Sequence, residues 1–226
     1  MRLMWHSFFY RLVVGGLRLL ITLGAHVRVE LFGSIPSGAC VLVSNHISHF
    51  DPPVLSGWLA RKIDWIAMSE LFSTAWSRIG FDWLDVIPVD RTGDDRKALR
   101  TALERLAQGR MVGVFPEGGI RDGAASILNG ASMREGAFLI ASKAHCPVVP
   151  VVILGTDRLY NIRRWFPGRR ARVFVAVGNP IPSGGRREMA EAAAKAIMDL
   201  KNQLAIRCGL DADDFPKPPR ERMRED

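Results

Sequence analysis

Residues 39–51, ACVLVSNHISHFD, carry a short apolar stretch directly into a polar segment. Later in the chain, the apolar stretch 111–115 leads in the same way into PEGGIR at 116–121. Short apolar runs bounded by turn residues are typical of buried strands. Ligands of open α/β sheets bind at the carboxyl ends of the strands. The two stretches therefore predict an α/β fold with a functional site where two strands end.

Strand-like and helix-like stretches alternate through the middle of the chain, which is typical of an α/β domain. We expect strands at 27–32, 39–43, 63–68, 85–89, 111–115, 148–153 and 172–177. We expect helices at 51–60, 94–108 and 187–207. Pro150 falls inside the sixth strand and has no N–H to donate. This strand is therefore predicted to lie at an edge, to carry a bulge or to begin after the proline.

The composition indicates a globular chain with a positive charge. Of the 226 residues, 48% are hydrophobic and 24% are charged, which provides enough apolar material for one core. The net charge of +8 favours an anionic partner without identifying it: a membrane surface, a phosphorylated substrate or nucleic acid. The three cysteines are far apart and form no Cys-x-x-Cys pair, so neither a zinc site nor a disulfide framework is predicted.

The two ends of the chain differ in composition from the middle. Residues 1–24 are apolar and aromatic but are interrupted by Arg2, Arg11 and Arg18. A spanning helix needs about 20 mostly uncharged residues, so we predict instead an amphipathic helix that lies in a membrane interface. The alternative is a helix packed on the protein's own core. Residues 209–226 are polar and alternately charged, which predicts a disordered tail.

His46 and Asp51 are candidates for a general base and its partner. A neutral imidazole can accept a proton, and a carboxylate on its other nitrogen fixes the tautomer and stabilises the imidazolium. The two side chains can meet if His46 lies in a loop and Asp51 begins the next helix, whereas one continuous helix would separate them. The alternatives are a helix cap with a solvated histidine, or a metal bound by His46, His49 and Asp51. The other histidines have no ligand-like spacing to these residues, so no metal site is predicted.

The segment after the second apolar stretch provides further candidates. Gly118 and Gly119 permit close backbone approach to a ligand. Arg121, and Arg91 after an earlier strand, are candidate phosphate ligands, because a guanidinium forms bidentate bonds with phosphate. Glu117 is expected to orient an arginine or to bond a substrate hydroxyl. The alternatives are an exposed glycine turn with a surface ion pair, and a solvated arginine at position 91.

In this order, the segments resemble the motifs of the lysophospholipid and glycerol-phosphate acyltransferase family, in particular its bacterial 1-acylglycerol-3-phosphate acyltransferases. The first family motif, Asn-His-x-x-x-x-Asp, matches residues 45–51. The second ends in an arginine, which matches Arg91. The third, Phe-Pro-Glu-Gly-Thr-Arg-Ser, matches residues 115–118 but has its arginine one position later, at Arg121. The fourth, Val-Pro-Val followed by apolar residues, matches 149–151.

This resemblance implies one α/β domain at 25–208, with a mixed, largely parallel sheet flanked by helices. It implies transfer of a fatty acyl chain from acyl-carrier protein or coenzyme A to the free hydroxyl of 1-acylglycerol-3-phosphate, giving phosphatidic acid without a cofactor. His46, held by Asp51, would take the hydroxyl proton. The residues implied to bind substrate are Asn45, Arg91, Phe115, Pro116, Glu117, Gly118 and Arg121. The chain has no Gly-x-Ser-x-Gly elbow, so no covalent acyl-enzyme is expected.

A lysolipid substrate also implies a membrane surface as partner, and we expect peripheral attachment at the cytoplasmic face of the cell membrane. The segment 158–172 carries arginines around Tyr160, Trp165 and Phe166, which suits anionic headgroups. An acidic acyl-carrier protein would use the same surface, and a solvated basic loop is the alternative. The other functions considered are acylation of glycerol-3-phosphate or an amino-acid lipid, an esterase, and a noncatalytic membrane-binding protein. No nucleic-acid partner is expected, because no reading motif is present.

Overall fold

The computed structural model describes residues 2–69, 82, 84–89, 96–166 and 168–216, with side chains from Phe9 onward. They form a seven-stranded sheet in the order β1-β7-β6-β2-β5-β3-β4. The strands are β1 (Ala25–Leu31), β2 (Cys40–Ser44), β3 (Ile63–Met68), β4 (Ile87–Val89), β5 (Met111–Val114), β6 (Val148–Leu154) and β7 (Ala171–Val177). The described α-helices are α1 (Arg2–Gly24), α2 (Asp51–Trp58), α4 (Arg96–Ala107), α5 (Gly136–Lys143) and α6 (Arg186–Cys208).

The sheet is mixed and largely parallel. Neighbouring strands are parallel in every pair except β6 and β7, which run antiparallel. The predicted α/β fold with a mixed, largely parallel sheet flanked by helices is therefore confirmed. Since β6, β2 and β5 are adjacent and parallel, their carboxyl ends lie at the same edge of the sheet.

Strand β6 is an interior strand, so the edge position predicted for it is wrong. It begins at Val148, lies between β7 and β2, and is buried along its whole length. Pro150 fits there because it lies opposite Gly178, the residue that follows the end of β7. The N–H of Gly178 donates to the Pro150 carbonyl at 2.9 Å, and the proline forgoes only the reciprocal bond.

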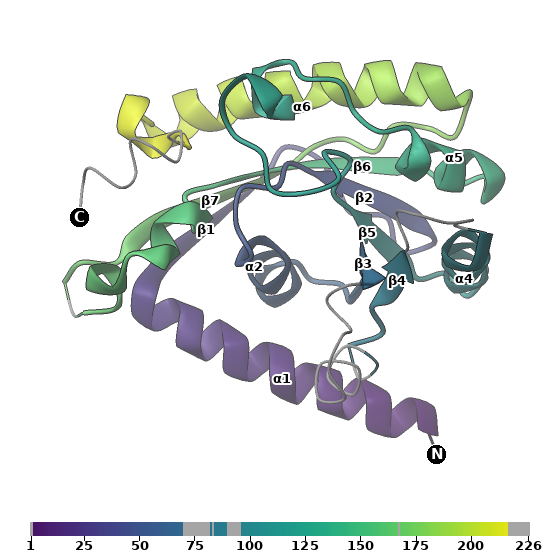
Figure 1. The fold of residues 1–226 in the computed structure, drawn as a ribbon, viewed down its shortest axis with the longest axis horizontal. Helices are drawn as coiled ribbons and strands as arrows, with labels where there is room; N and C mark the ends of the chain where they lie inside the picture. The colour runs from purple at the N-terminus through teal and green to yellow at the C-terminus, as the bar shows by residue number, and fades with distance from the viewer. Residues whose placement is uncertain (1, 70–81, 83, 90–95, 167, 217–226) are drawn as a thin grey trace.

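Different helices cover the two faces of the sheet (Figure 1). α1 and α2 cover one face, where Leu42 and Val151 are buried. α4, α5 and α6 cover the other face, where Val41 and Val152 are buried. Alternate residues of the central strands therefore face opposite helical layers, as expected for strands buried on both sides.

Helix α1 packs on the domain with one side and leaves a second apolar side exposed. Tyr10 and Ile21 are buried, and the guanidinium carbon of Arg18 lies 5.1 Å from the ring centroid of Trp58 on α2. More than half of each side chain is exposed at Leu12, Leu19, Leu20 and Leu23. Of the helix predicted at 1–24, the structure describes Arg2–Gly24 as α1. One side of α1 packs on the core, and another side is apolar and exposed. Among the helices in the described ranges, none combines the length and hydropathy needed to cross a bilayer.

The first part of the C-terminal segment is ordered against the domain. After α6, a short 3-10 helix at Ala212–Asp214 brings Asp214 to two arginines of the 158–172 segment. Its carboxylate pairs with Arg158 at 3.3 Å and with Arg172 at 3.2 Å. Residues 209–216 of the predicted disordered tail are therefore folded in the structure, whereas residues 217–226 lie outside the described part.

Candidate active site

Three chain segments meet at the carboxyl edge of the central strands. Residues 45–50, here called the histidine loop, follow β2, and the glycine turn 115–119 follows β5. A 3-10 helix at Thr156–Tyr160 follows β6. The sequence patterns predicted the first two segments at the site. The third joins them because β6 is the direct neighbour of β2.

His46 and Asp51 are joined by a hydrogen bond. Nδ1 of His46 lies 2.8 Å from Oδ2 of Asp51, with the carboxylate fully buried and the imidazole 15% exposed. An ionised carboxylate only accepts hydrogen bonds, so Nδ1 carries the shared proton and Nε2 keeps a free lone pair. This is the contact that the spacing predicts, and the imidazole is not turned out to solvent.

Asp51 holds the histidine loop that precedes it, and does not act as a cap for α2. No side-chain cap bond is formed at the start of that helix. Oδ2 of Asp51 accepts bonds from the backbone N–H groups of Ile47 (2.7 Å) and Ser48 (2.8 Å). Oδ1 accepts a bond from the hydroxyl of Thr156. With the imidazole, these donors satisfy both oxygens of a buried carboxylate.

Asn45 fastens the histidine loop to β6. Its side-chain N–H donates to the carbonyl of Ile153 at 2.8 Å, and its side-chain oxygen accepts the N–H of the same residue at 2.8 Å. The amide is fully buried and both of its ends are used. Asn45 was expected to bind substrate, but the structure gives it a bracing position.

Glu117 fastens the loop from the other side. Its carboxylate accepts bonds from the backbone N–H of His46 (2.6 Å), the backbone N–H of Ile127 (2.8 Å) and the hydroxyl of Ser126 (2.9 Å). Burial raises the pKa of Glu117, and these bonds oppose that effect. Both oxygens are bonded to protein groups, which gives Glu117 a bracing position between the histidine loop and residues 126–127.

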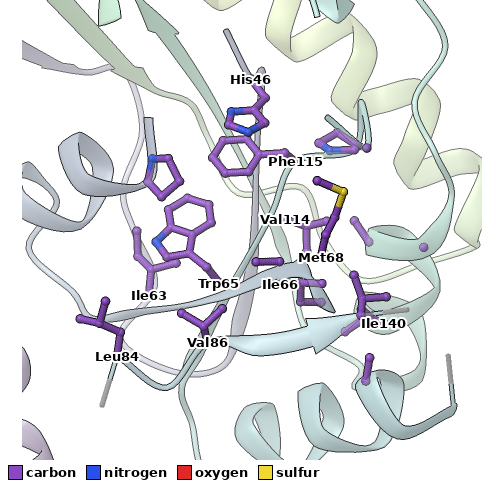
Figure 2. Close-up of a pocket in the computed structure, with 18 of the residues that line it drawn as sticks. His46, Ile63, Trp65, Ile66, Met68, Leu84, Val86, Val114, Phe115 and Ile140 are labelled. Carbon is purple, nitrogen blue, oxygen red and sulfur yellow. The ribbon is translucent and has the colours of Figure 1, made fainter. Parts of the chain in front are cut away.

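A cavity of about 790 Å³ opens beside His46 (Figure 2). Apolar side chains from α1, β3, α4 and α5 form most of its wall, among them Val14, Leu99 and Ile140. The His46 imidazole stacks on the ring of Phe115, with centroids 4.1 Å apart and planes at 18°. His46 therefore lines a chamber suited to a hydrocarbon chain.

Arg134 brings a cation to the same cavity. Its side chain crosses Gly118 so closely that a Cβ at position 118 would lie 2.5 Å from Nε and Cζ of the guanidinium. Gly118 also has a φ of +68°, which favours glycine. Both residues line the cavity with Pro116, whose carbonyl accepts the Arg134 backbone N–H at 2.9 Å. Within the described part of the chain, the Arg134 guanidinium has no ion-pair partner.

A family model described as Acyltransferase matches residues 26–154, which is more than half of the chain. The match contains the histidine loop and the glycine turn. The chain belongs to the acyltransferase family. This acyltransferase is therefore an enzyme, and the alternative of a noncatalytic protein with the same fold is set aside.

Individual relatives and one solved structure agree with this membership. The chain is 24% identical over 206 residues to the 1-acyl-sn-glycerol-3-phosphate acyltransferase of Bacillus subtilis, covering 86% of this chain and 98% of that protein. It is 31% identical over 205 residues to the lyso-ornithine lipid O-acyltransferase of Pseudomonas aeruginosa, covering 80% and 74%. The crystal structure of the 1-acyl-sn-glycerophosphate acyltransferase from Thermotoga maritima is similar with a TM-score of 0.62 and 25% identity, covering 85% and 81%.

The remaining expected site residues of this acyltransferase differ in position. Phe115, Pro116 and Gly118 line the cavity. Arg121 has an exposed side chain outside the cavity lining, and only its backbone N–H reaches the histidine loop, at the His46 carbonyl (2.8 Å). Arg91 lies outside the described residues.

His49, the third member of the rival metal set, turns away from the pair. Its Nδ1 lies 2.6 Å from the hydroxyl of Tyr160, and the side chain is exposed. Among the described residues, no group of three or more His, Cys, Asp or Glu side chains is arranged to hold a metal ion.

Sequence patterns did not identify two residues that the acyltransferase site contains. Arg134 lies between Met133 and Glu135, in a segment that follows the third motif, and no site role was predicted for it. Thr156 follows the fourth motif, and the apolar residues of that motif predicted a packing role only. Only the adjacency of β6 and β2 would have indicated that Thr156 lies near Asp51.

Proposed function

We propose that this acyltransferase moves a fatty acyl chain from a thioester, on acyl-carrier protein or coenzyme A, to the free hydroxyl of 1-acylglycerol-3-phosphate. The product is phosphatidic acid, and the thiol of the donor is released. The observation that carries this proposal is the placing of the His46–Asp51 pair beside both an apolar cavity and the Arg134 guanidinium. In a lysophosphatidate acylation, the base would act on the acceptor hydroxyl, the guanidinium would bind the phosphate and the apolar cavity would hold an acyl chain.

The proton path follows from the orientation of the imidazole. Nε2 of His46 takes the proton from the acceptor hydroxyl as its oxygen attacks the thioester carbonyl, and Asp51 stabilises the imidazolium. The tetrahedral intermediate then expels the thiolate, which takes the proton back from the imidazolium. The base is restored, and no covalent acyl-enzyme is formed. General-base catalysis of this kind contributes about 10²–10⁴-fold to the rate.

Arg134 supports an acceptor that carries a phosphate. A guanidinium binds phosphate through two parallel hydrogen bonds, and such bonds are strongest when both partners are charged. The guanidinium lies against Gly118 in the glycine turn, so it is placed at the end of the cavity that carries His46 and Phe115. We therefore assign the headgroup-binding role to Arg134 in place of Arg121.

The exposed side of α1 supports action at a membrane surface. Leu12, Leu19 and Leu23 present an apolar stripe, and beside the end of this helix Ile162 and Phe166 are 70% and 59% exposed. Trp165 joins the two regions, since a Cβ at Gly24 would lie 3.0 Å from its ring. Arg169 and Arg170 of the same 158–172 segment are exposed, as expected for contact with anionic lipids. We propose peripheral attachment to the cytoplasmic face of the cell membrane through this surface.

A second acceptor is favoured by one observation. The relative from Pseudomonas aeruginosa, whose name specifies a lyso-ornithine lipid, is 31% identical over 80% of this chain. A lyso-ornithine lipid offers a free hydroxyl and an acyl chain but no phosphate. The base and the cavity would serve it equally, whereas the Arg134 guanidinium would lack its phosphate partner.

Mass spectrometry of the lipid products separates these acceptors. Purified protein is given lysophosphatidate, lyso-ornithine lipid or glycerol-3-phosphate, each with an acyl-carrier protein donor and with a coenzyme A donor. Phosphatidic acid as the dominant product supports the proposal. Efficient acylation of another acceptor, with lysophosphatidate left unchanged, overturns it, and release of free fatty acid with water as the sole acceptor would indicate an esterase.

His46→Ala tests the base directly. We expect transfer to fall by about 10²–10⁴-fold with the circular dichroism spectrum unchanged, because the imidazole removes a proton and its loss leaves the fold intact. His26→Ala is the matched control, since His26 is exposed on β1, away from the site.

A further inference from the structure

We infer that Trp65 is a positioning residue for His46: it fixes the ring of Phe115, and the Phe115 ring in turn fixes the plane of the imidazole. This inference rests on the proposed role of His46 as the base. Trp65 belongs to none of the four sequence motifs and was not among the expected site residues.

Three aromatic rings form a column that ends at the base (Figure 2). The imidazole of His46 lies over Phe115 at a centroid distance of 4.1 Å, with the planes at 18°. Phe115 lies over the indole of Trp65 at 4.7 Å, with the planes at 3°. The rings come from the histidine loop, from the end of β5 and from β3, so the column joins three segments that are distant in sequence.

The register of the sheet places Trp65 in the column. Trp65 on β3 pairs with Gly113 on β5, and Phe115, two positions after Gly113 and directly past the end of β5, packs in the same cluster as Trp65. A Cβ at Gly113 would lie 2.6 Å from Cε3 and 2.7 Å from Cζ3 of the indole. Only glycine therefore lets the indole lie flat against β5 and reach Phe115.

A hydrogen bond and burial also hold the indole of Trp65 in place. Its Nε1 donates a hydrogen bond to the hydroxyl of Ser56 on α2 at 2.9 Å, and the residue is only 6% exposed. A large ring with a fixed plane and a satisfied N–H provides a rigid support for the Phe115 ring.

The stack supplies a constraint that Asp51 does not. The bond from Nδ1 to Oδ2 holds the imidazole by one atom at its edge. Stacking on Phe115 contacts the face of the ring and so opposes tilting about the Cα–Cβ and Cβ–Cγ bonds, which the edge contact alone restrains less. The aromatic face also attracts the positive charge that the ring acquires when it takes a proton. Loss of the support should therefore affect both the orientation of the base and its proton affinity.

Trp65→Leu and Trp65→Phe test this role, with Ile140→Ala as control. Leucine removes the ring and enlarges the cavity, whereas phenylalanine retains a ring for the stack. Ile140 lines the same cavity but lies on α5, outside the column (Figure 2). The two readouts are the kcat and KM of transfer, and the titration of His46 followed by NMR of histidine-labelled protein without substrate. The His46 signal is assigned by its absence from His46→Ala.

We expect Trp65→Leu to lower kcat about tenfold or more with a KM change below about threefold, and to shift the NMR titration of His46 to lower pH. Trp65→Phe should restore most of both, and Ile140→Ala should leave the titration unchanged. The ionisable side chains bonded to the His46 residue, Asp51 and Glu117, are present in all three variants.

The inference is overturned if Trp65→Leu leaves the His46 titration unchanged and alters only KM, as a cavity-lining residue would. It is also overturned if Trp65→Phe behaves like Trp65→Leu in both readouts. The titration needs no acceptor, so it gives its result even if lysophosphatidate is not the substrate. Failure of the proposed acceptor would appear in the product analysis alone, with the titration shift retained.

Discussion

Thr156 and Asp51 are joined by a hydrogen bond between residues 105 positions apart in the sequence. The threonine hydroxyl donates to Oδ1 of the carboxylate, the oxygen that does not face His46. Both residues are fully buried. The bond therefore links the segment after β6 to the base through its carboxylate partner, and it prevents Asp51 from rotating away from the imidazole.

Thr156→Val should impair both stability and transfer. It keeps the shape of the side chain but leaves a buried carboxylate oxygen without a donor, which costs about 1–3 kcal/mol of unfolding free energy. We also expect kcat to fall about tenfold, because the carboxylate that orients the imidazole loses one of its anchors.

Thr156→Ser is the matched control, since it restores the hydroxyl and removes one methyl group. Urea denaturation gives the unfolding free energy, and initial rates give kcat. A Thr156→Val protein that is less stable but transfers acyl chains at the wild-type rate would show that the bond serves the fold alone.

Arg134→Ala and Arg121→Ala should differ sharply in their effect on KM. Loss of a charge-assisted bond to phosphate is worth about 1.5–3 kcal/mol, so Arg134→Ala should raise the KM for lysophosphatidate by about tenfold or more. Arg121→Ala should change it by less than about twofold, because that side chain is exposed outside the cavity. A larger effect of Arg121→Ala than of Arg134→Ala would instead assign phosphate binding to Arg121, the arginine of the third motif.

The sequence patterns predicted the strands well because their periodicity is local. The expected strands at 63–68 and 172–177 correspond to β3 at Ile63–Met68 and β7 at Ala171–Val177. The placing of β6 could not be predicted from its proline, since the cost of a missing N–H depends on what lies opposite. Pro150 lies opposite the end of β7, and this depends on a strand pairing that single-sequence patterns do not reveal.

The site shows the same division between local and distant information. The contact of His46 with Asp51 lies within one loop and was predictable from spacing. The bond from Asn45 to Ile153 and the crossing of Gly118 by Arg134 join segments that only the folded sheet brings together. Motif matching assigned Asn45 and Glu117 to substrate, whereas their hydrogen bonds show that they brace the loop.

Charges on the outer side of α1 should weaken membrane binding. In the double variant Leu19→Glu, Leu23→Glu, two apolar side chains become anionic, so we expect binding to vesicles of anionic lipid to fall at least about tenfold. Ile206→Glu is the control, because Ile206 is 85% exposed on α6, which covers the other face of the sheet (Figure 1). Cosedimentation with vesicles measures both. Equal binding by the two variants would exclude α1 as the contact surface, and binding lost only on mutation of arginines in 158–172 would place the contact there.

Asp64 should make the stability of the domain depend on pH in a defined direction. Burial raises the pKa of Asp64 to about 6, and Arg110, at 2.6 Å from Oδ1, opposes the rise only in part. Its other oxygen has no hydrogen-bond partner in the described part of the chain. In the unfolded chain the group returns to a pKa near 3.8. The folded state therefore binds this proton more tightly, so the contribution to stability is complete below about pH 4 and is lost as the pH rises through about 6.

Asp64→Asn removes this titration while it keeps the size of the side chain. The difference in unfolding free energy between wild type and Asp64→Asn should decrease by on the order of 2 kcal/mol between about pH 4.5 and about pH 7.5. The neighbouring Asp85 is present in both proteins. Burial would raise the pKa of Asp85, but bonds from Lys62 and Arg110 outweigh burial and hold it below its usual value. Its contribution has the opposite sign, lies at lower pH and largely cancels in the difference. Urea denaturation at several pH values measures both curves, and parallel curves would mean that Arg110 keeps Asp64 ionised throughout this range.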